Sequence, residues 1–487
     1  MTADARDENV RHEDSRHAIS HYDGAPSLEV TLAGVRFRSP IGLAPIGGGS
    51  HFGGRDPDEV REHEVRLRFL RRLVRAGTNS LVLNVSYLAE DTLAAVLREA
   101  PPGTARPRGG WGERTMNVKT GDAPYGLEGL YSAVSPGPGT PAIEVEKAIL
   151  RSQAKLVDDL KRDLPDGVPI VGGLIGCGGL PDAYVDAARA CEGLGVDLVE
   201  VNFHCPLQAG MRHALDAALD GRFPPYSQGG LMVEHPDLIE RVVGAVVAVV
   251  DVPVGVKFSA EVGFPRIVGL ARRVRDAGAK YVHVGGAAVG IAPPDIYDRG
   301  RPTWPFAASN PFCLTSGSWM RRSCYRDIAA VARFVPGIDI AASGGLVTPE
   351  HCIEAMMLGA TITQHCTAVM EQGTTLLGRS NAFLREFLSA QGYAGAHELI
   401  GLGQPYIEYS DEADIAVTPA VARWDQERCT LCGHCWNNMC VAISPEEGCV
   451  RVDSDLCTGC GACTIACQNG ALSLVHRTGV RGAQSDA

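Results

Sequence analysis

The sequence predicts an α/β protein, in which a (β/α)8 TIM barrel is followed by a small cysteine-rich domain. Three observations lead to this fold class. The chain has 487 residues, which suits a large barrel with one added module. Short apolar runs alternate with amphipathic helical stretches from residue 41 to about 390. Nine of the 16 cysteines follow residue 428, and eight of those stand at metal-cluster spacings.

Eight apolar runs are the predicted strands of the barrel. Each is short, β-branched and apolar on both faces, as strands buried in a parallel sheet are. Amphipathic helices separate them, the last at roughly 373–391. Eight strand–helix units favour a closed barrel over the alternative, an open doubly wound sheet. The runs are IGLAPI (41–46), SLVLNV (80–85), VPIVGGLIG (168–176), LVEVNFHCP (198–206), VPVGVKF (252–258), YVHVGG (281–286), IDIAASGG (338–345) and ITQHCTAVM (362–370).

The composition is that of a globular protein, with 45% hydrophobic and 21% charged residues. The formal net charge of −12 argues against a nucleic-acid partner, since phosphate binders usually present a basic face. No apolar run reaches the roughly 18 residues that a membrane span needs. The polar start of the chain is unlike a secretory signal, so we expect a cytoplasmic protein whose thiolates bind metal.

Four regions follow from this pattern. We expect a loose N-terminal tail at 1–27, the barrel at 28–391, a connector at 392–423 and the cysteine-rich domain with a C-terminal tail at 424–487. Long segments leave the carboxyl ends of three strands. Two of them, 86–146 and 287–319, are rich in Gly and Pro, and the third, 207–235, is a candidate lid.

Two cysteine runs predict the role of the small domain. Cys429–Cys440 has the pattern C-x2-C-x2-C-x4-C, and Cys457–Cys467 has C-x2-C-x2-C-x3-C. Where two [4Fe–4S] clusters are bound this way, the tight triplet of one run holds each cluster together with the last cysteine of the other run. Zinc sites use two pairs of ligands, so two successive triplets argue against zinc. The rule assigns Cys429, Cys432, Cys435 and Cys467 to one cluster, and Cys457, Cys460, Cys463 and Cys440 to the other.

Residues 424–476 resemble a bacterial 2[4Fe-4S] ferredoxin, a small α+β domain. The first run departs from that pattern by one extra residue, and Val441 and Gln468 stand where a proline usually follows the last cysteine. Cys449 is a spare thiol, more typical of a small apolar residue than of a ligand. Clusters carry single electrons, so the barrel is expected to hold a flavin, which converts one-electron steps into a two-electron reaction.

The candidate site lies at the carboxyl ends of the strands, where TIM barrels place their active sites. The run ASGGLVTPEH offers a phosphate cradle, because two glycines let backbone N–H groups approach an anion. Lys257 ends an apolar strand and would suit a flavin edge that gains negative charge; a salt bridge to Glu200 is the alternative. The expected cofactor-binding residues are Ala44, Pro45, Asn84, Asn202, Lys257, Gly286, Ser316, Gly317, Ser343, Gly344, Gly345, Cys366 and Thr367.

Six motifs resemble the dihydroorotate dehydrogenase family: LEVTLAGVRFRSPIGLAP, LVEVNFHCP, VPVGVKF, SGS, ASGGLVTPE and CTAVMEQG. With the cluster domain added, residues 28–476 are similar to the FMN-plus-ferredoxin subunit type of bacterial dihydropyrimidine dehydrogenases. The resemblance implies that Cys205 is the general acid/base and that Asn202 touches flavin and substrate. A thiol with a pKa of about 8.5 can give the proton that reduction of a conjugated C=C bond requires.

The chain departs from that family where a pyrimidine would be read. Asn84-Val85 stands in place of Lys-Thr, and Glu128 stands in place of an asparagine. Gly285-Gly286 stands in place of Asn-Thr or Asn-Ser, and His204 in place of a serine. A site that pairs the amide edges of a ring needs those asparagines, so we expect a substrate other than a standard pyrimidine. His204 is a further catalytic candidate, for proton transfer with Cys205.

The sequence thus predicts an oxidoreductase acting on CH–CH bonds. It would reduce or form a C=C bond beside a carbonyl, with hydride from FMN N5 and electrons passed through two [4Fe–4S] clusters. The chain shows no recognisable dinucleotide motif, so we expect an NAD(P)H–FAD reductase subunit or a ferredoxin as electron partner, within a homo-oligomer or hetero-complex. The alternative is an electron-transfer subunit whose barrel performs no substrate chemistry.

Overall fold

A computed structural model of the chain describes residues 24–45, 60–85, 87–99, 114–119, 127–132, 142–174, 180–204, 232, 235–302, 312–409 and 419–477. The chain divides into two compact units, Met1–Ile407 and Glu408–Ala487. No helix within the described ranges is long and apolar enough to cross a membrane.

Eight parallel strands form the sheet of the first unit, in the order in which they follow along the chain. Pairing runs from β4 through β7, β8, β9, β10, β15 and β16 to β3. Each strand falls within a predicted apolar run, so the predicted barrel is confirmed. The strands are β3 (Ile41–Leu43), β4 (Leu81–Val85), β7 (Ile170–Leu174), β8 (Leu198–Asn202), β9 (Val254–Lys257), β10 (Tyr281–Val284), β15 (Asp339–Ala342) and β16 (Ile362–His365).

Side chains bridge the seam between β3 and β4, the two ends of the hydrogen-bonded order. Asn79 Nδ2 donates to Pro40 O at 3.1 Å, and the Leu43 N–H donates to Thr78 Oγ1 at 3.3 Å. Gly42 makes room for this contact, because a Cβ there would lie 1.8 Å from Asn79 Oδ1. The barrel is therefore nearly closed, with side chains in place of a backbone ladder at its last joint.

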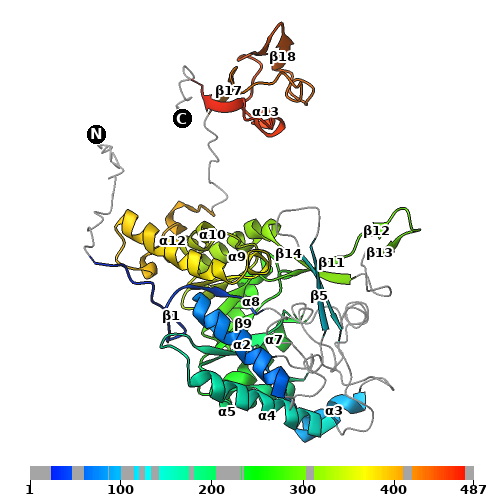
Figure 1. The fold of residues 1–487 in the computed structure, drawn as a ribbon, viewed down its shortest axis with the longest axis vertical. Coiled ribbons are helices and arrows are strands. Elements are labelled where there is room, and N and C mark those ends of the chain that lie inside the picture. Colours follow the sequence, from blue (N-terminus) through cyan, green and yellow to red (C-terminus); the bar gives the residue numbers. More distant parts are fainter. Residues whose placement is uncertain are drawn as a thin grey trace, which may run out of the picture. The chain divides into compact units, whose positions relative to one another are not determined.

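Helices cover the outside of the barrel (Figure 1). Neighbours pack in pairs, α2 on α4, α5 on α7, α7 on α8 and α8 on α9, and α12 packs on both α10 and α2. The outer layer thus closes beside the same seam. The helices are α2 (Val60–Ala76), α3 (Glu90–Glu99), α4 (Ala142–Lys161), α5 (Pro181–Gly193), α7 (Pro236–Val247), α8 (Arg266–Asp276), α9 (Arg321–Phe334), α10 (Pro349–Met357), α11 (Thr367–Gln372) and α12 (Thr375–Gln391).

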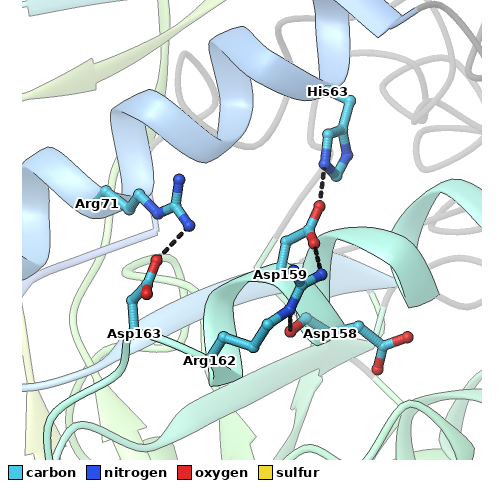
Figure 2. A network of polar contacts seen from close by, with 6 residues as sticks. All are labelled: His63, Arg71, Asp158, Asp159, Arg162 and Asp163. Atoms are coloured by element: carbon cyan, nitrogen blue, oxygen red, sulfur yellow. Dashed lines mark hydrogen bonds and ion pairs between the residues drawn. The ribbon is translucent and has the colours of Figure 1, made fainter.

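A polar network joins α2 to α4 on the outside of the barrel (Figure 2). His63 Nε2 lies 2.6 Å from Asp159 Oδ2, and Arg162 pairs with the same carboxylate. Arg71 pairs with Asp163 one turn further on. The hydrogen bond from His63 is the main reason why the pKa of Asp159 is lowered. The network therefore joins two neighbouring helices of the outer layer.

The two long segments that follow β4 and β10 pair with each other. The strands form one antiparallel sheet in the order β11-β14-β6-β5, and three of them are labelled together in Figure 1. A hairpin of β12 (Pro294–Asp295) and β13 (Arg301–Pro302) projects from the body of the unit (Figure 1). The sheet consists of β5 (Arg114–Lys119), β6 (Leu127–Ser132), β11 (Ala288–Ile291) and β14 (Phe312–Ser316).

Residues 392–407, the first part of the predicted connector, pack on the barrel. Two short 3-10 helices, η3 (Ala396–Leu399) and η4 (Gln404–Tyr406), follow α12. Ser27 forms a β-bridge with Gly395, close to β1 (Val30–Leu32) and β2 (Val35–Phe37). Gln404 Nε2 donates to Ala329 O at 3.2 Å. The division into units accordingly comes after this segment.

The second unit is a small α+β arrangement. β17 (Ala420–Trp424) pairs with β20 (Leu472–His476), and β18 (Ile443–Glu446) pairs with β19 (Cys449–Val452). One short helix, α13 (Ala462–Ala466), lies between β19 and β20 in the chain. Cysteines form part of its small core, whose buried members are Ala422, Cys435, Ile443, Val450, Cys463 and Leu472.

Candidate active site

Polar side chains from neighbouring strands gather at the carboxyl end of the barrel. Glu200, Asn202 and His204 alternate along β8 and just past its end, so they share one face. Asn202 pairs in register with Lys257 of β9, and Lys257 pairs with His283 of β10. All five are at most 7% exposed. The fold thus brings ionisable groups of three strands together where TIM barrels place their sites.

A buried hydrogen-bonded chain runs through this cluster. Glu200 Oε2 accepts from the Tyr281 hydroxyl at 3.2 Å and lies 3.1 Å from His283 Nδ1. His283 Nε2 lies 2.9 Å from Ser343 Oγ on the far side of the ring. Burial raises the pKa of Glu200, but His283, Lys257 and Tyr281 outweigh it and the net pKa is lowered. Burial and Lys257 lower the pKa of His283, so its ring is a neutral link between Glu200 and Ser343.

His204 is held at both its backbone and its ring. Its backbone N–H donates to Asn202 Oδ1 at 2.8 Å, which orients that amide. Its ring Nε2 accepts from the Ala287 N–H at 3.3 Å. Burial, Lys257 and His283 together hold the pKa of His204 well below its usual range. The ring is therefore neutral at the pH of a cell.

Two glycine turns lie against each other beside this cluster. A Cβ on Gly285 would lie 1.9 Å from Ser343 O, and one on Gly344 would lie 3.2 Å from Gly286 N. Both turns need positive φ, at +91° for Gly285 and +95° for Gly344. Glycine turns of this kind can direct backbone N–H groups at an anion, because no side chain blocks its approach. This is how such turns bind phosphate.

Arg321, at the start of α9, lies against the second glycine turn. A Cβ on Gly345 would lie 2.4 Å from Arg321 N. The guanidinium contacts His351, while Arg321 Nε is buried and has no hydrogen-bond partner among the described residues. A glycine turn beside an orphaned guanidinium N–H fits an anionic group such as the phosphate of FMN.

The structure also brings together predicted residues from two distant segments. Ser316 Oγ, at the end of β14, lies 2.9 Å from Thr367 Oγ1, at the start of α11. Gly317 follows with φ +141° and leads into the 3-10 helix η2 (Ser318–Met320). Burial raises the pKa of Cys366 to about 11, although Lys257 opposes the rise. The Cys366 thiol is thus protonated at neutral pH.

The remaining predicted residues lie at the ends of their strands. Ala44 is buried, and its N–H donates to His365 O at 2.8 Å, while Pro45 is half-buried. Asn84 leans toward the neighbouring strand, where a Cβ on Gly173 would lie 2.8 Å from Asn84 Oδ1. Cys205 and most of the candidate lid lie outside the described residues.

Sequence reasoning missed three members of the cluster: Tyr281, His283 and Arg321. Tyr281 and His283 alternate with Gly285 along β10, so the period of a strand would have placed them on the inner face. Arg321 carries no such signal. Its position beside Gly345 depends on the packing of α9 against β15, which no local pattern predicts.

In the second unit, one group of cysteines lines a small, partly open cavity. The group consists of Cys429, Cys432, Cys435 and Cys467, with Trp424 and Trp436 among the other lining residues. Burial raises the pKa of Cys435, and the thiols of Cys467 and Cys429 raise it further. Four thiols around one cavity fit the donor set of a [4Fe–4S] cluster.

The other cysteines form a second group. Burial raises the pKa of Cys463, and the thiols of Cys440, Cys457 and Cys460 add to this rise. Each group therefore contains cysteines of both runs, as the crossed ligand assignment requires. In the part of the chain that the structure describes, no three His, Cys, Asp or Glu side chains form a group that would hold a single metal ion.

Two family descriptions match the chain. The description "4Fe-4S binding domain" matches residues 450–473, which include Cys457, Cys460, Cys463 and Cys467. The description "Dihydrouridine synthase (Dus)" matches residues 175–370, which extend from the end of β7 into α11. The predicted iron–sulfur domain after a barrel is thereby confirmed.

Three relatives match parts of the chain. The catalytic subunit of dihydroorotate dehydrogenase B (NAD(+)) from Methanothermobacter thermautotrophicus is 27% identical over 297 residues, which cover 61% of this chain and 82% of the relative. Subunit PreA of the NAD-dependent dihydropyrimidine dehydrogenase of Escherichia coli K12 is 23% identical over 314 residues, 64% of each chain. The catalytic subunit of dihydroorotate dehydrogenase B from Pyrococcus furiosus is 28% identical over 227 residues, 47% of this chain and 67% of the relative.

The aligned part of this chain thus spans slightly less than two thirds of the Escherichia coli relative. The observed fold and the similar proteins agree on a barrel that is followed by an iron–sulfur domain. Eight parallel strands form a nearly closed barrel, and a 4Fe-4S domain follows it. Over its barrel the chain is similar to dihydroorotate and dihydropyrimidine dehydrogenases, which are oxidoreductases, and a 4Fe-4S domain follows the barrel.

Proposed function

We propose that the chain is an FMN- and iron–sulfur-dependent oxidoreductase that reduces, or forms, a C=C bond beside a carbonyl. The proposal depends on the buried polar side chains around Lys257. They adjoin two glycine turns that suit an anionic cofactor. Its relatives are dihydroorotate and dihydropyrimidine dehydrogenases. The same chain carries cysteines in two groups, which suit two clusters.

The residues that would hold FMN come from several segments at the carboxyl end of the barrel. Gly344 and Gly345, with Arg321, suit the phosphate, and Ser316 and Thr367 offer hydroxyls from neighbouring segments. Lys257 suits an electron-rich edge of the isoalloxazine ring. The remaining proposed contacts are Ala44, Pro45, Asn84, Asn202, Gly286, Gly317, Ser343 and Cys366. Bound FMN would supply hydride transfer at N5 and would exchange single electrons with the clusters.

Cys205 is the proposed proton donor to the carbon that does not receive hydride. It directly follows His204, at the carboxyl end of β8 where the site lies. A thiol of ordinary pKa, about 8.5, is protonated at neutral pH and can act as an acid. Gly285 and Gly286 offer no side-chain amide to a ring, so the proposed substrate is not a standard pyrimidine.

Electrons would pass through two [4Fe–4S] clusters to or from a partner. Both the Methanothermobacter thermautotrophicus and the Escherichia coli relatives are described as subunits. We therefore infer a cytoplasmic hetero-complex with an NAD(P)H–FAD reductase subunit, or exchange with a ferredoxin; a homo-oligomer of this chain is compatible with either. The alternative function is an electron-transfer subunit without substrate chemistry, which the absence of side chains at Gly285 and Gly286 favours.

Anaerobic purification with iron and flavin analysis tests the cofactors. We expect one FMN and about eight iron atoms per chain, since two cubane clusters contain that number. Stopped-flow reoxidation of the reduced protein by cyclohex-2-en-1-one tests the chemistry. Cys205→Ala should slow it by at least about 100-fold, the usual size of an acid-catalysis effect, whereas Cys449→Ala should leave it unchanged. Equal rates for the Cys205 variant and the parent would favour the electron-transfer alternative.

A further inference from the structure

The ring of His204 occupies the space that a side chain at position 286 would need. A Cβ on Gly286 would lie 2.7 Å from His204 Cε1 and 3.0 Å from each ring nitrogen. Gly286 also has φ +150°, a conformation that side-chain-bearing residues rarely adopt. The imidazole is therefore seated on the glycine turn after β10, and the missing side chain is what makes room for it.

The backbone of that turn determines which ring nitrogen carries the proton. A backbone N–H can only donate, so Nε2 must present its lone pair to the Ala287 N–H, 3.3 Å away. A neutral imidazole has one proton, which is then on Nδ1. His204 thus offers a hydrogen-bond donor at Nδ1, and has no spare proton to release as an acid.

That donor lacks a partner inside the described part of the protein. His204 Nδ1 is buried, and no described group accepts a hydrogen bond from it. A buried donor without an acceptor destabilises the protein, so a bound acceptor would recover this free energy. Lys257 and His283 are close enough to influence the ring electrostatically, and the cation of Lys257 favours an oxygen that carries partial negative charge.

We propose that His204 is a specificity-determining residue whose Nδ1–H binds the carbonyl or carboxylate oxygen conjugated to the C=C bond of the substrate. The preferred class is α,β-unsaturated carbonyl compounds that need no amide N–H to be recognised, because Gly285 and Gly286 present no side-chain acceptor. This inference rests on the proposed function. It gives His204 a binding task and leaves the proton of the reaction to Cys205.

Binding of simple probes to the anaerobic holoenzyme tests the proposal. Calorimetric titration would compare cyclohex-2-en-1-one, which has the conjugated oxygen, with cyclohexene, which lacks it. We expect the parent protein to prefer the enone, and His204→Phe to weaken enone binding about tenfold, which corresponds to about 1.4 kcal/mol. His204→Asn should keep most of the affinity, because its amide nitrogen lies near the former position of Nδ1. Cyclohexene binding should change little in either variant.

A change beside the ring provides a second test. Gly286→Ala should reproduce the loss of enone binding while His204 is intact, because the new methyl group displaces the imidazole. Gly269→Ala is the matched control, since a Cβ at that helical position meets no atom within 4 Å. It should bind the enone like the parent.

Nitrogen-15 NMR of histidine-labelled protein gives a readout that does not depend on turnover. The His204 ring, assigned from its absence in His204→Phe, should carry its proton on Nδ1. A proton on Nε2, or equal enone affinities in the parent and His204→Phe, would overturn the proposal. A parent that binds neither probe would also overturn it, whereas the proposed function stands or falls on FMN, iron and Cys205.

Discussion

Glu200 and His283 face each other inside the barrel, with Glu200 Oε2 3.1 Å from His283 Nδ1. The pair links β8 to β10, and the other ring nitrogen continues the chain to Ser343 at 2.9 Å. A neutral His283 donates to the carboxylate and accepts from the hydroxyl, so the Ser343 proton points toward the ring. Through His283 and Ser343, hydrogen bonds connect the buried carboxylate of Glu200 to the glycine turn that is proposed to bind a phosphate.

Glu200 and Lys257 should depend on each other for stability. We expect Glu200→Gln to lower the free energy of unfolding of the barrel by about 2 kcal/mol, because a charged acceptor is lost. Lys257→Met should also destabilise, since Glu200 then lacks the nearby cation. Removing both charges should cost less than the sum of the two single changes. Anaerobic urea unfolding followed by circular dichroism would measure this, and strictly additive free energies would contradict the coupling.

Acidification should destabilise the barrel through buried histidines. The pKa values of the buried His204, His283 and His365 are all lowered, first of all by burial. The unfolded chain binds protons at its ordinary histidine pKa of about 6.5, whereas the folded state does so only at lower pH. Stability is therefore intact above about pH 6.5 and falls below it, by up to about 1.4 kcal/mol per pH unit for each histidine.

Unfolding free energies at about pH 7.5 and about pH 5.5 would check this pH dependence. The buried His204 provides the matched control, because His204→Phe removes one proton-binding site from the unfolded state. The slope of stability against pH should be smaller in that variant. Equal stability of the parent protein at both pH values would show that the histidines titrate normally in the folded state.

The seam between β3 and β4 should tolerate no side chain at position 42. Gly42→Ala would place a methyl group against the Asn79 amide, and overpacking of this kind costs about 1–3 kcal/mol. Asn79→Ala alone should also destabilise, because it removes the hydrogen bond to Pro40. The double variant should be more stable than Gly42→Ala alone, since the clash is relieved. Thermal melting would rank the variants, and the opposite order would contradict the steric account.

The grouping of cysteines from both runs predicts how single substitutions change the iron content. Cys440→Ser and Cys463→Ser change members of the same group, so each should remove the same cluster, leaving about four of about eight iron atoms. Combining the two should cause no further loss of iron. Cys435→Ser combined with Cys463→Ser should remove both clusters. Iron and sulfide analysis with EPR would measure this, and a further loss in the Cys440–Cys463 double variant would contradict the grouping.

The barrel could be predicted because its signals are local. Each strand is a short apolar run flanked by a helix, and parallel strands in such units usually follow chain order. The signals of the cysteine runs are also local. Their spacing alone suggests that Cys440 and Cys467 each join the triplet of the other run. Cys467 lines the same cavity as Cys429, Cys432 and Cys435, and the assignment of ligands to two clusters stays a prediction.

Features that depend on contacts between distant segments could not be predicted in the same way. The pairing of β6 with β14 joins two glycine-rich segments whose sequences give no register. The contact of Arg321 with Gly345 arises from helix packing. The contact of the His204 ring with Gly286 depends on how far β8 and β10 are shifted along each other. That shift is set by the register of both strands with β9, which the sequence does not give. Cys205 stays a prediction.

The pairing of β6 with β14 also has a consequence for the order of assembly. Leu127 of β6 pairs with Ser316 of β14, and strands β7 to β10 are made between them. Such a long loop closes late, because its ordering entropy is recovered only once the intervening strands have folded. Ser316 therefore reaches Thr367 only in a chain whose barrel is almost complete. A half-synthesised barrel therefore lacks the Ser316–Thr367 contact. If FMN binds these two hydroxyls, as proposed above, it would be loaded only onto a finished barrel.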